Sequence, residues 1–138
     1  MKKTVLFDLH VSLGAQIVPF GGWDMPMQYS SILREAKAVR SYAGIFDVSH
    51  MGLVAIKGKQ AAGFLNLLVT ANVAKMAFGR AKYTLICNEF GGIIDDTILY
   101  RFDEENFLLV PNASNTDEVL QWIHKWQSNW GMSMEINL

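Results

Sequence analysis

Three short segments of alternating side chains follow one another between residues 82 and 110, and this succession constrains the fold more than any other feature. Lys82–Cys87 and Ile93–Arg101 are separated by the turn sequence Asn88–Gly92, and a second turn, Asp103–Asn106, leads into Phe107–Val110. Asn, Asp and Gly accept the backbone conformations of tight turns, which join neighbouring strands running in opposite directions. The sequence therefore predicts an antiparallel sheet.

Helices are predicted before and after these three strands. Gln60–Val69 carries apolar residues at helical spacing, and so does the segment after Ser114, which is the expected N-cap of the second helix. Leu53–Lys57 and Met132–Leu138 are predicted as further strands. Residues 53–138 thus give the order β-α-β-β-β-α-β, which predicts an α+β domain with both helices on one face of an antiparallel sheet.

Residues 1–52 lack the regular strand and helix patterns of the rest of the chain and are predicted to belong to another domain. Residues 12–29 hold Pro19 and Pro26 among glycines, methionines and Trp23, a mixture that excludes a long helix and predicts an irregular segment. A helix is expected to follow, capped by Ser30 or Ser31 and ended by Gly44.

Charge and composition exclude several classes of protein. Twelve basic and 13 acidic residues give a net charge of −1, which leaves no basic surplus for coating nucleic acid. The chain is 51% hydrophobic, which excludes disorder, and no apolar run approaches a membrane span. Cys87 is the only cysteine, so we expect no intrachain disulfide and a cytoplasmic location.

The most informative candidate site is the pair Asp95–Asp96. Neighbours on a strand point to opposite faces, so the two carboxylates are not expected to share a proton. Asp96 shares its face with Ile94, Ile98 and Tyr100, and a carboxylate among apolar neighbours is costly to ionise, which suits proton transfer. The alternative is a structural carboxylate that accepts backbone hydrogen bonds.

Other candidate sites are weaker. Asp47, Ser49 and His50 lie too close together in the chain to converge as a hydrolase triad, and His10 and His124 are expected to be structural or on the surface. Glycine-rich phosphate loops and ligand-spaced metal clusters are absent, so no metal is expected.

Several blocks taken together resemble the glycine cleavage T-protein family, the aminomethyltransferases. The matching blocks are Leu6–His10, Val18–Pro26, Gln28–Ser30, Ala38–Arg40, Gly44–Gly52, Gly91–Asp96 and Val110–Asn115. The resemblance covers nearly the whole chain and keeps the order and spacing of the family. It implies that residues 53–138 form the ferredoxin-like domain of that architecture, and that residues 1–52 belong to its first domain.

The resemblance also implies a reaction. Members of this family take the aminomethyl group from the lipoyl arm of H-protein, pass its methylene to tetrahydrofolate and release ammonia. Carried over by position, Asp96 matches the catalytic carboxylate, and Met51, Tyr83 and Asn112 match positions that line the folate pocket. Nucleic acid and membranes are not expected as partners.

The sequence departs from the family pattern in three ways, and two alternatives to the enzyme stay open. Thr70–Val73 differs in sequence, Pro111 replaces a valine, and the chain is much shorter than family members, which implies an N-terminal portion that is inactive alone. The alternative function is a non-catalytic folate-binding module like the iron–sulfur assembly factors of the same fold. An isolated portion is also expected to self-associate through an apolar patch that includes Trp23–Met27.

Overall fold

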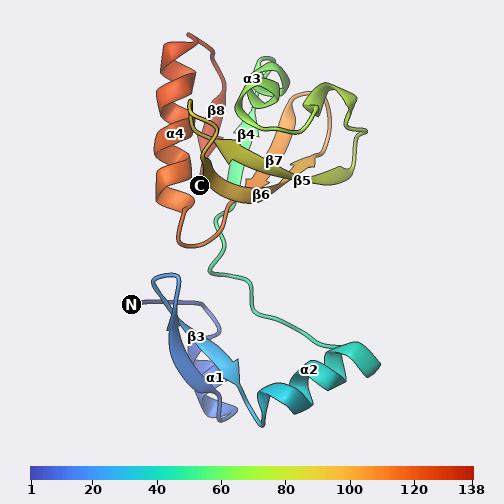
Figure 1. Cartoon of the computed structure of the whole chain (residues 1–138), viewed down its shortest axis with the longest axis vertical. Helices are drawn as coiled ribbons and strands as arrows, with labels where there is room; N and C mark the ends of the chain where they lie inside the picture. Colours follow the sequence, from blue (N-terminus) through green and yellow to red (C-terminus); the bar gives the residue numbers. More distant parts are fainter. The chain divides into compact units, whose positions relative to one another are not determined.

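A computed structural model describes all 138 residues and divides the chain into two compact units. The first unit comprises Met1–His50 and the second comprises Met51–Leu138, so the division falls two residues before the boundary expected after Gly52. Each unit has its own sheet and helices (Figure 1).

The second unit contains a five-stranded sheet with strand order β5-β6-β7-β4-β8, in which every neighbouring pair is antiparallel. Its elements, in chain order, are β4 (Val54–Lys57), α3 (Ala61–Leu68), the 3-10 helix η1 (Val73–Lys75), β5 (Arg80–Cys87), β6 (Ile93–Arg101), β7 (Asn106–Val110), α4 (Thr116–Asn129) and β8 (Glu135–Asn137). The predicted order β-α-β-β-β-α-β is confirmed.

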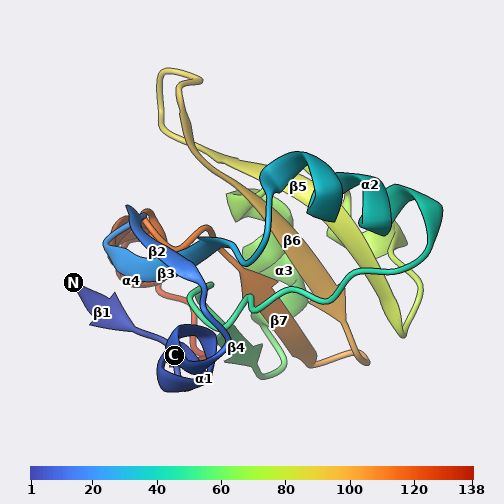
Figure 2. The ribbon, with the colours of Figure 1, turned by 90° about the horizontal axis from the view of Figure 1, so that it is seen from below.

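Both helices cover the same face of this sheet, as predicted. Phe64 and Leu65 of α3 and Val119 and Ile123 of α4 are buried in one core. The strand residues of that core are Val54, Ile56, Ile86, Leu99, Phe107 and Leu109. Figure 2 shows α3 behind the strands β6 and β7. Burial of these apolar side chains, at about 25 cal/mol per Å² of apolar surface, is the main stabilising contribution.

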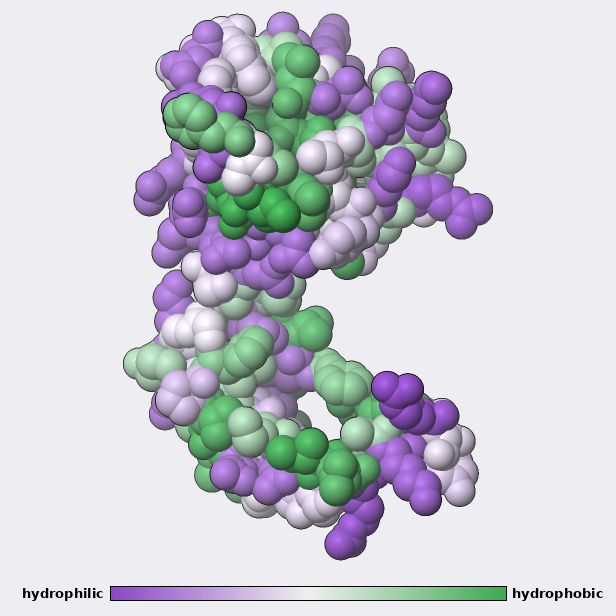
Figure 3. Space-filling view, viewed as in Figure 1, coloured by the Kyte–Doolittle hydropathy of each residue, from purple (hydrophilic) through white to green (hydrophobic).

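The opposite face of the sheet carries no helix of the second unit. Tyr83, Ile98 and Tyr100 lie on it and are 62%, 37% and 37% exposed. Hydrophobic side chains reach the surface in both units (Figure 3). This open face is where Asp96 also lies, because Asp96 alternates with Ile98 and Tyr100 along β6.

The first unit corrects one expectation from the sequence. Its elements are β1 (Lys2–Lys3), α1 (Phe7–Ser12), β2 (Gln16–Phe20), β3 (Trp23–Gln28) and α2 (Ile32–Ser41). The segment predicted to be irregular is therefore a β-hairpin, with the strand order β1-β3-β2. Gly21 and Gly22 have positive φ angles of 55° and 86° and form its two-residue turn.

The two prolines fit this hairpin because each lies where a strand is unpaired on one side. Pro19 is on the edge strand β2, and Pro26 is beyond the part of β3 that pairs with β1. Within the segment Trp23–Met27, which was expected to contribute to an apolar patch, Met25 is buried and Met27 is exposed.

Helix α2 begins as the sequence indicated and ends differently. Of the two candidate caps, Ser31 accepts a hydrogen bond from the Arg34 amide, while the Glu35 carboxylate accepts one from each of the three amides of Tyr29, Ser30 and Ser31. Gly44 lacks a positive φ, so it is not the expected C-terminal glycine of the helix. A Cβ at Gly44 would collide with Cγ2 of Val39, so close packing explains the glycine.

Candidate functional site

The side chains of Asp95 and Asp96 project to opposite faces of the sheet, because neighbouring side chains alternate along β6. Asp95 is 1% exposed and lies on the face that α3 and α4 cover, whereas Asp96 is exposed on the open face. The expectation that apolar neighbours desolvate Asp96 is therefore wrong, and the buried carboxylate is Asp95. The core lies on the Asp95 side because Thr97 and Leu99 alternate with it.

Tyr83 reaches Asp96 across the neighbouring strand. In the register of β5 and β6, Leu85 is opposite Asp96 and Tyr83 is opposite Ile98, so the two side chains are diagonal neighbours. The Tyr83 hydroxyl donates a hydrogen bond to Oδ2 of Asp96. This bond, followed by burial and the charges of Asp96 and Asp95, raises the pKa of Tyr83 above its ordinary value.

Asn112 binds both aspartates from the loop between β7 and α4. Its Nδ2 lies 3.0 Å from Oδ1 of Asp96, 2.8 Å from the Asp96 carbonyl oxygen and 3.0 Å from Oδ1 of Asp95. Its backbone amide donates to Oδ2 of Asp95 over 3.0 Å. Tyr83, Asp96 and Asn112, three residues singled out from the sequence, therefore form one hydrogen-bonded cluster on the second unit.

Met51 is connected to this cluster through a backbone hydrogen bond of its neighbour Gly52. It is half-buried and precedes Gly52, whose amide donates to the carbonyl oxygen of Pro111 over 3.2 Å. Pro111 is buried directly after the end of β7, so its missing amide hydrogen removes no bond from the sheet. The position of Met51 thus depends on the same contact that anchors the loop carrying Asn112.

Asn115 is a member of the site that sequence analysis missed. Its Nδ2 donates to Oδ1 of Asp95 over 2.7 Å, and it occupies the N-cap position of α4 that was expected for Ser114. Its side chain makes no cap bond to the helix because it is committed to Asp95. Two signals in the sequence pointed to it: Asn115 follows Asn112 by three residues, and it is the last residue of the block Val110–Asn115 that resembles the family.

A second polar cluster lies in the first unit around Asp47. Oδ2 of Asp47 accepts hydrogen bonds from Oγ1 of Thr4 at 2.6 Å and from Nε2 of His10 at 2.8 Å, and Oδ1 accepts one from the Ser49 amide at 2.9 Å. Nδ1 of His10 accepts from the Tyr29 hydroxyl over 2.7 Å. Asp47 thus pairs with His10 and not with His50, which agrees with the rejection of a triad.

This cluster predicts a dependence of stability on pH. Burial raises the pKa of Asp47, but hydrogen bonds from His10, Ser49 and Thr4 outweigh burial and leave the pKa well below its ordinary value. A carboxyl whose pKa is lower in the folded state stabilises the fold fully above its unfolded pKa of about 3.9 and loses this contribution as the pH falls further. Asp47→Asn should therefore destabilise the first unit by about 1–3 kcal/mol at pH 7, with a difference that shrinks toward pH 2.

Urea unfolding between pH 2 and pH 7, followed through amide resonances of the first unit, measures this difference. Asp24→Asn is the matched control, because Asp24 lies in the same unit and makes no side-chain hydrogen bond there. If the free energy of unfolding changed with pH equally in Asp47→Asn and in the unmodified chain, the prediction would be contradicted.

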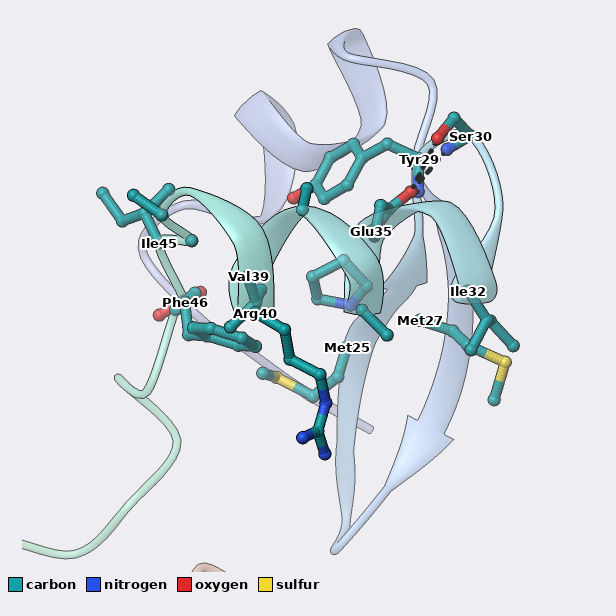
Figure 4. Close-up of a pocket in the computed structure, with 16 residues that line it drawn as sticks. Met25, Met27, Tyr29, Ser30, Ile32, Glu35, Val39, Arg40, Ile45 and Phe46 are labelled. Carbon is teal, nitrogen blue, oxygen red and sulfur yellow. Dashed lines mark hydrogen bonds between the residues drawn. The ribbon is translucent and has the colours of Figure 1, made fainter.

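A cavity of about 760 Å³ lies in the first unit beside α2. Figure 4 shows its apolar lining from β3, from α2 and from the segment that follows α2. The labelled apolar residues are Met25, Met27, Ile32, Val39, Ile45 and Phe46.

The chain contains no group of three or more His, Cys, Asp or Glu side chains that could hold a metal ion. It also contains no helix that is long and apolar enough to span a membrane.

Comparison with solved structures identifies the architecture. The chain superposes on the crystal structure of glycine cleavage system aminomethyltransferase T from Bartonella henselae with a TM-score of 0.93 and 36% identity, covering 98% of this chain and 37% of that one. The α+β fold is thus that of a glycine cleavage T-protein. The model of the GCVT N-terminal domain matches residues 6–137, and the chain belongs to this family.

The relatives that are similar in sequence are aminomethyltransferases. The aminomethyltransferase of Symbiobacterium thermophilum is 48% identical over 132 residues, which are 96% of this chain and 35% of that protein. The aminomethyltransferase of Halalkalibacterium halodurans is 50% identical over 125 residues, which are 91% of this chain and 34% of that protein. The chain spans about a third of the length of these relatives.

Proposed function

We propose that the chain supplies the catalytic carboxylate and part of the folate site of an aminomethyltransferase of the glycine cleavage system. The substrates are the aminomethyl group on the lipoyl arm of H-protein and tetrahydrofolate. The carbon–sulfur bond to the lipoyl arm and the carbon–nitrogen bond to the amino group break, and the methylene forms two bonds to nitrogen atoms of tetrahydrofolate. The two protons that these nitrogens lose go to the sulfur of the lipoyl arm and to the departing ammonia. The cluster of Tyr83, Asp96 and Asn112 is the observation that carries this proposal.

The cluster suits a reaction in which charge moves between nitrogen atoms. Asp96 carries a carboxylate whose two oxygens are oriented by Tyr83 and Asn112 and which is open to a ligand on the exposed face. A preorganised carboxylate stabilises positive charge that develops on a nearby nitrogen, or takes a proton from it. The exposed ring of Tyr83 and the thioether of Met51 offer apolar surface for the planar rings of folate.

The proposal extends to partners and location. Lipoylated H-protein is the proposed protein partner, the location is cytoplasmic, and the reaction needs no metal. The relatives compared are named aminomethyltransferases, which supports the enzyme over the alternative of a non-catalytic folate-binding module.

Titration of the 138-residue chain with tetrahydrofolate, followed by NMR, tests the binding part of the proposal. We expect the resonances of Met51, Tyr83, Asp96 and Asn112 to shift together, with a Kd in the millimolar range. Because the chain covers about a third of the length of its relatives, we expect it to hold only part of the folate site. Shifts confined to the first unit, or no shifts at millimolar ligand, would contradict the proposed site.

A further inference from the structure

Asp95 is a buried carboxylate that the proposed reaction does not use. It is 1% exposed and forms no ion pair with a Lys, Arg or His side chain. Burial of a carboxylate without a cation is costly unless hydrogen bonds compensate for the lost water. The buried carboxylate of Asp95 must therefore be stabilised by hydrogen bonds from uncharged groups.

Three N–H groups converge on Asp95, and they come from only two residues. Oδ2 accepts from the Asn112 backbone amide at 3.0 Å, and Oδ1 accepts from Nδ2 of Asn112 at 3.0 Å and from Nδ2 of Asn115 at 2.7 Å. Every group that faces the carboxylate is a donor, so both oxygens must be acceptors. An asparagine at this position would turn its own NH₂ group toward at least one of these donors.

The arrangement around Asn112 depends on this carboxylate. All three partners of its Nδ2 are acceptors: Oδ1 of Asp95, the Asp96 carbonyl oxygen and Oδ1 of Asp96. These acceptors fix the orientation of the side-chain amide, with its NH₂ group toward the aspartates. Oδ1 of Asn112 makes no hydrogen bond within the second unit and remains free to accept one.

We propose that Asp95 is a positioning residue, which acts through Asn112 to orient the Asp96 carboxylate and to present Oδ1 of Asn112 to an N–H donor of the bound ligand. This inference rests on the proposed function, because it assigns to the ligand a donor group that faces Asn112. It assigns Asp95 no contact with the ligand, since that side chain is buried on the other face of the sheet.

Asp95→Asn tests the role at nearly constant side-chain volume, and Thr97→Val is the matched control. Thr97 is also 1% exposed on the same face of β6, and its hydroxyl donates to the Val110 carbonyl at 2.7 Å, so its loss also removes one buried hydrogen bond. Thr97 makes no bond to Asn112. The test therefore separates the orientation of Asn112 from a general loss of stability.

In the tetrahydrofolate titration we expect Asp95→Asn to weaken binding at least tenfold and Thr97→Val to change it less than twofold. The resonances of the Asn112 side-chain amide should shift in Asp95→Asn and stay in place in Thr97→Val. Equal effects of the two variants on binding and on the Asn112 amide would overturn the proposal, because Asp95 would then be merely structural.

One further measurement keeps the proposal falsifiable. If Asp95→Asn does not fold, scalar couplings across the hydrogen bonds from Nδ2 of Asn112 to the carboxyl carbons of Asp95 and Asp96 can be measured in the unmodified chain, and their absence would overturn it. If the unmodified chain does not bind tetrahydrofolate, the proposed function fails, and with it the assigned ligand contact. The couplings would still decide whether Asp95 orients Asn112.

Discussion

Replacing Gly52 by valine is expected to destabilise the second unit by about 3 kcal/mol and to displace the loop that carries Asn112. A Cβ at this position would lie 2.6 Å from Oγ1 and 2.8 Å from Cγ2 of Thr116, and 2.8 Å from Cγ of Pro111. These atoms belong to a buried proline and a buried threonine and have little room to move. The hydroxyl of Thr116 also donates to the Asn112 carbonyl, so the displacement would reach the site.

Urea unfolding together with the resonances of the Asn112 side chain measures both effects, and Gly63→Ala is the control. Gly63 lies within α3, and a Cβ there would meet no atom within 4 Å, so alanine should stabilise the helix by up to about 1 kcal/mol. If Gly52→Val were as stable as the unmodified chain and left Asn112 unshifted, close packing would not be the reason for this glycine.

The fold of residues 53–138 could be predicted because its signals are local. Alternation in β6 and the turn residues around Asn88–Gly92 specify neighbouring antiparallel strands without any long-range information. The place of β4 between β7 and β8 pairs strands that are far apart in the sequence, so local signals alone do not specify it.

The first unit shows where local signals fail. Pro19 and Pro26 argue against strands in general, yet both occupy positions without a partner on one side. Whether a strand is central or at an edge depends on the whole sheet. A sequence pattern therefore cannot distinguish this hairpin from an irregular segment.

The candidate site was predicted in part, and partly for the wrong reason. Alternation correctly placed Asp95 and Asp96 on opposite faces, but it did not show which face the helices cover, so burial was assigned to Asp96 instead of Asp95. The role of Asn115 depends on a contact with a residue 20 positions away, which spacing alone does not reveal.

Asp96→Asn is expected to reduce aminomethyl transfer about 10³-fold in a protein of the relatives' full length that contains this chain. Asparagine keeps the size of the side chain. Its Oδ1 can accept from Asn112 and its NH₂ group can donate to the Tyr83 hydroxyl, so the three side chains can stay together. It lacks the negative charge and the basic oxygen on which the proposed reaction depends. We therefore expect kcat to fall much more than KM for tetrahydrofolate changes.

Release of ammonia from aminomethylated H-protein, dependent on tetrahydrofolate, is the most direct measurement of this role. Glu104→Gln is the control, because it removes one exposed carboxylate from the turn before β7 and should leave the rate within twofold of the unmodified enzyme. The account predicts a loss of about 10³-fold for Asp96→Asn alone. A rate for Asp96→Asn within threefold of the control would show that the reaction does not depend on this carboxylate.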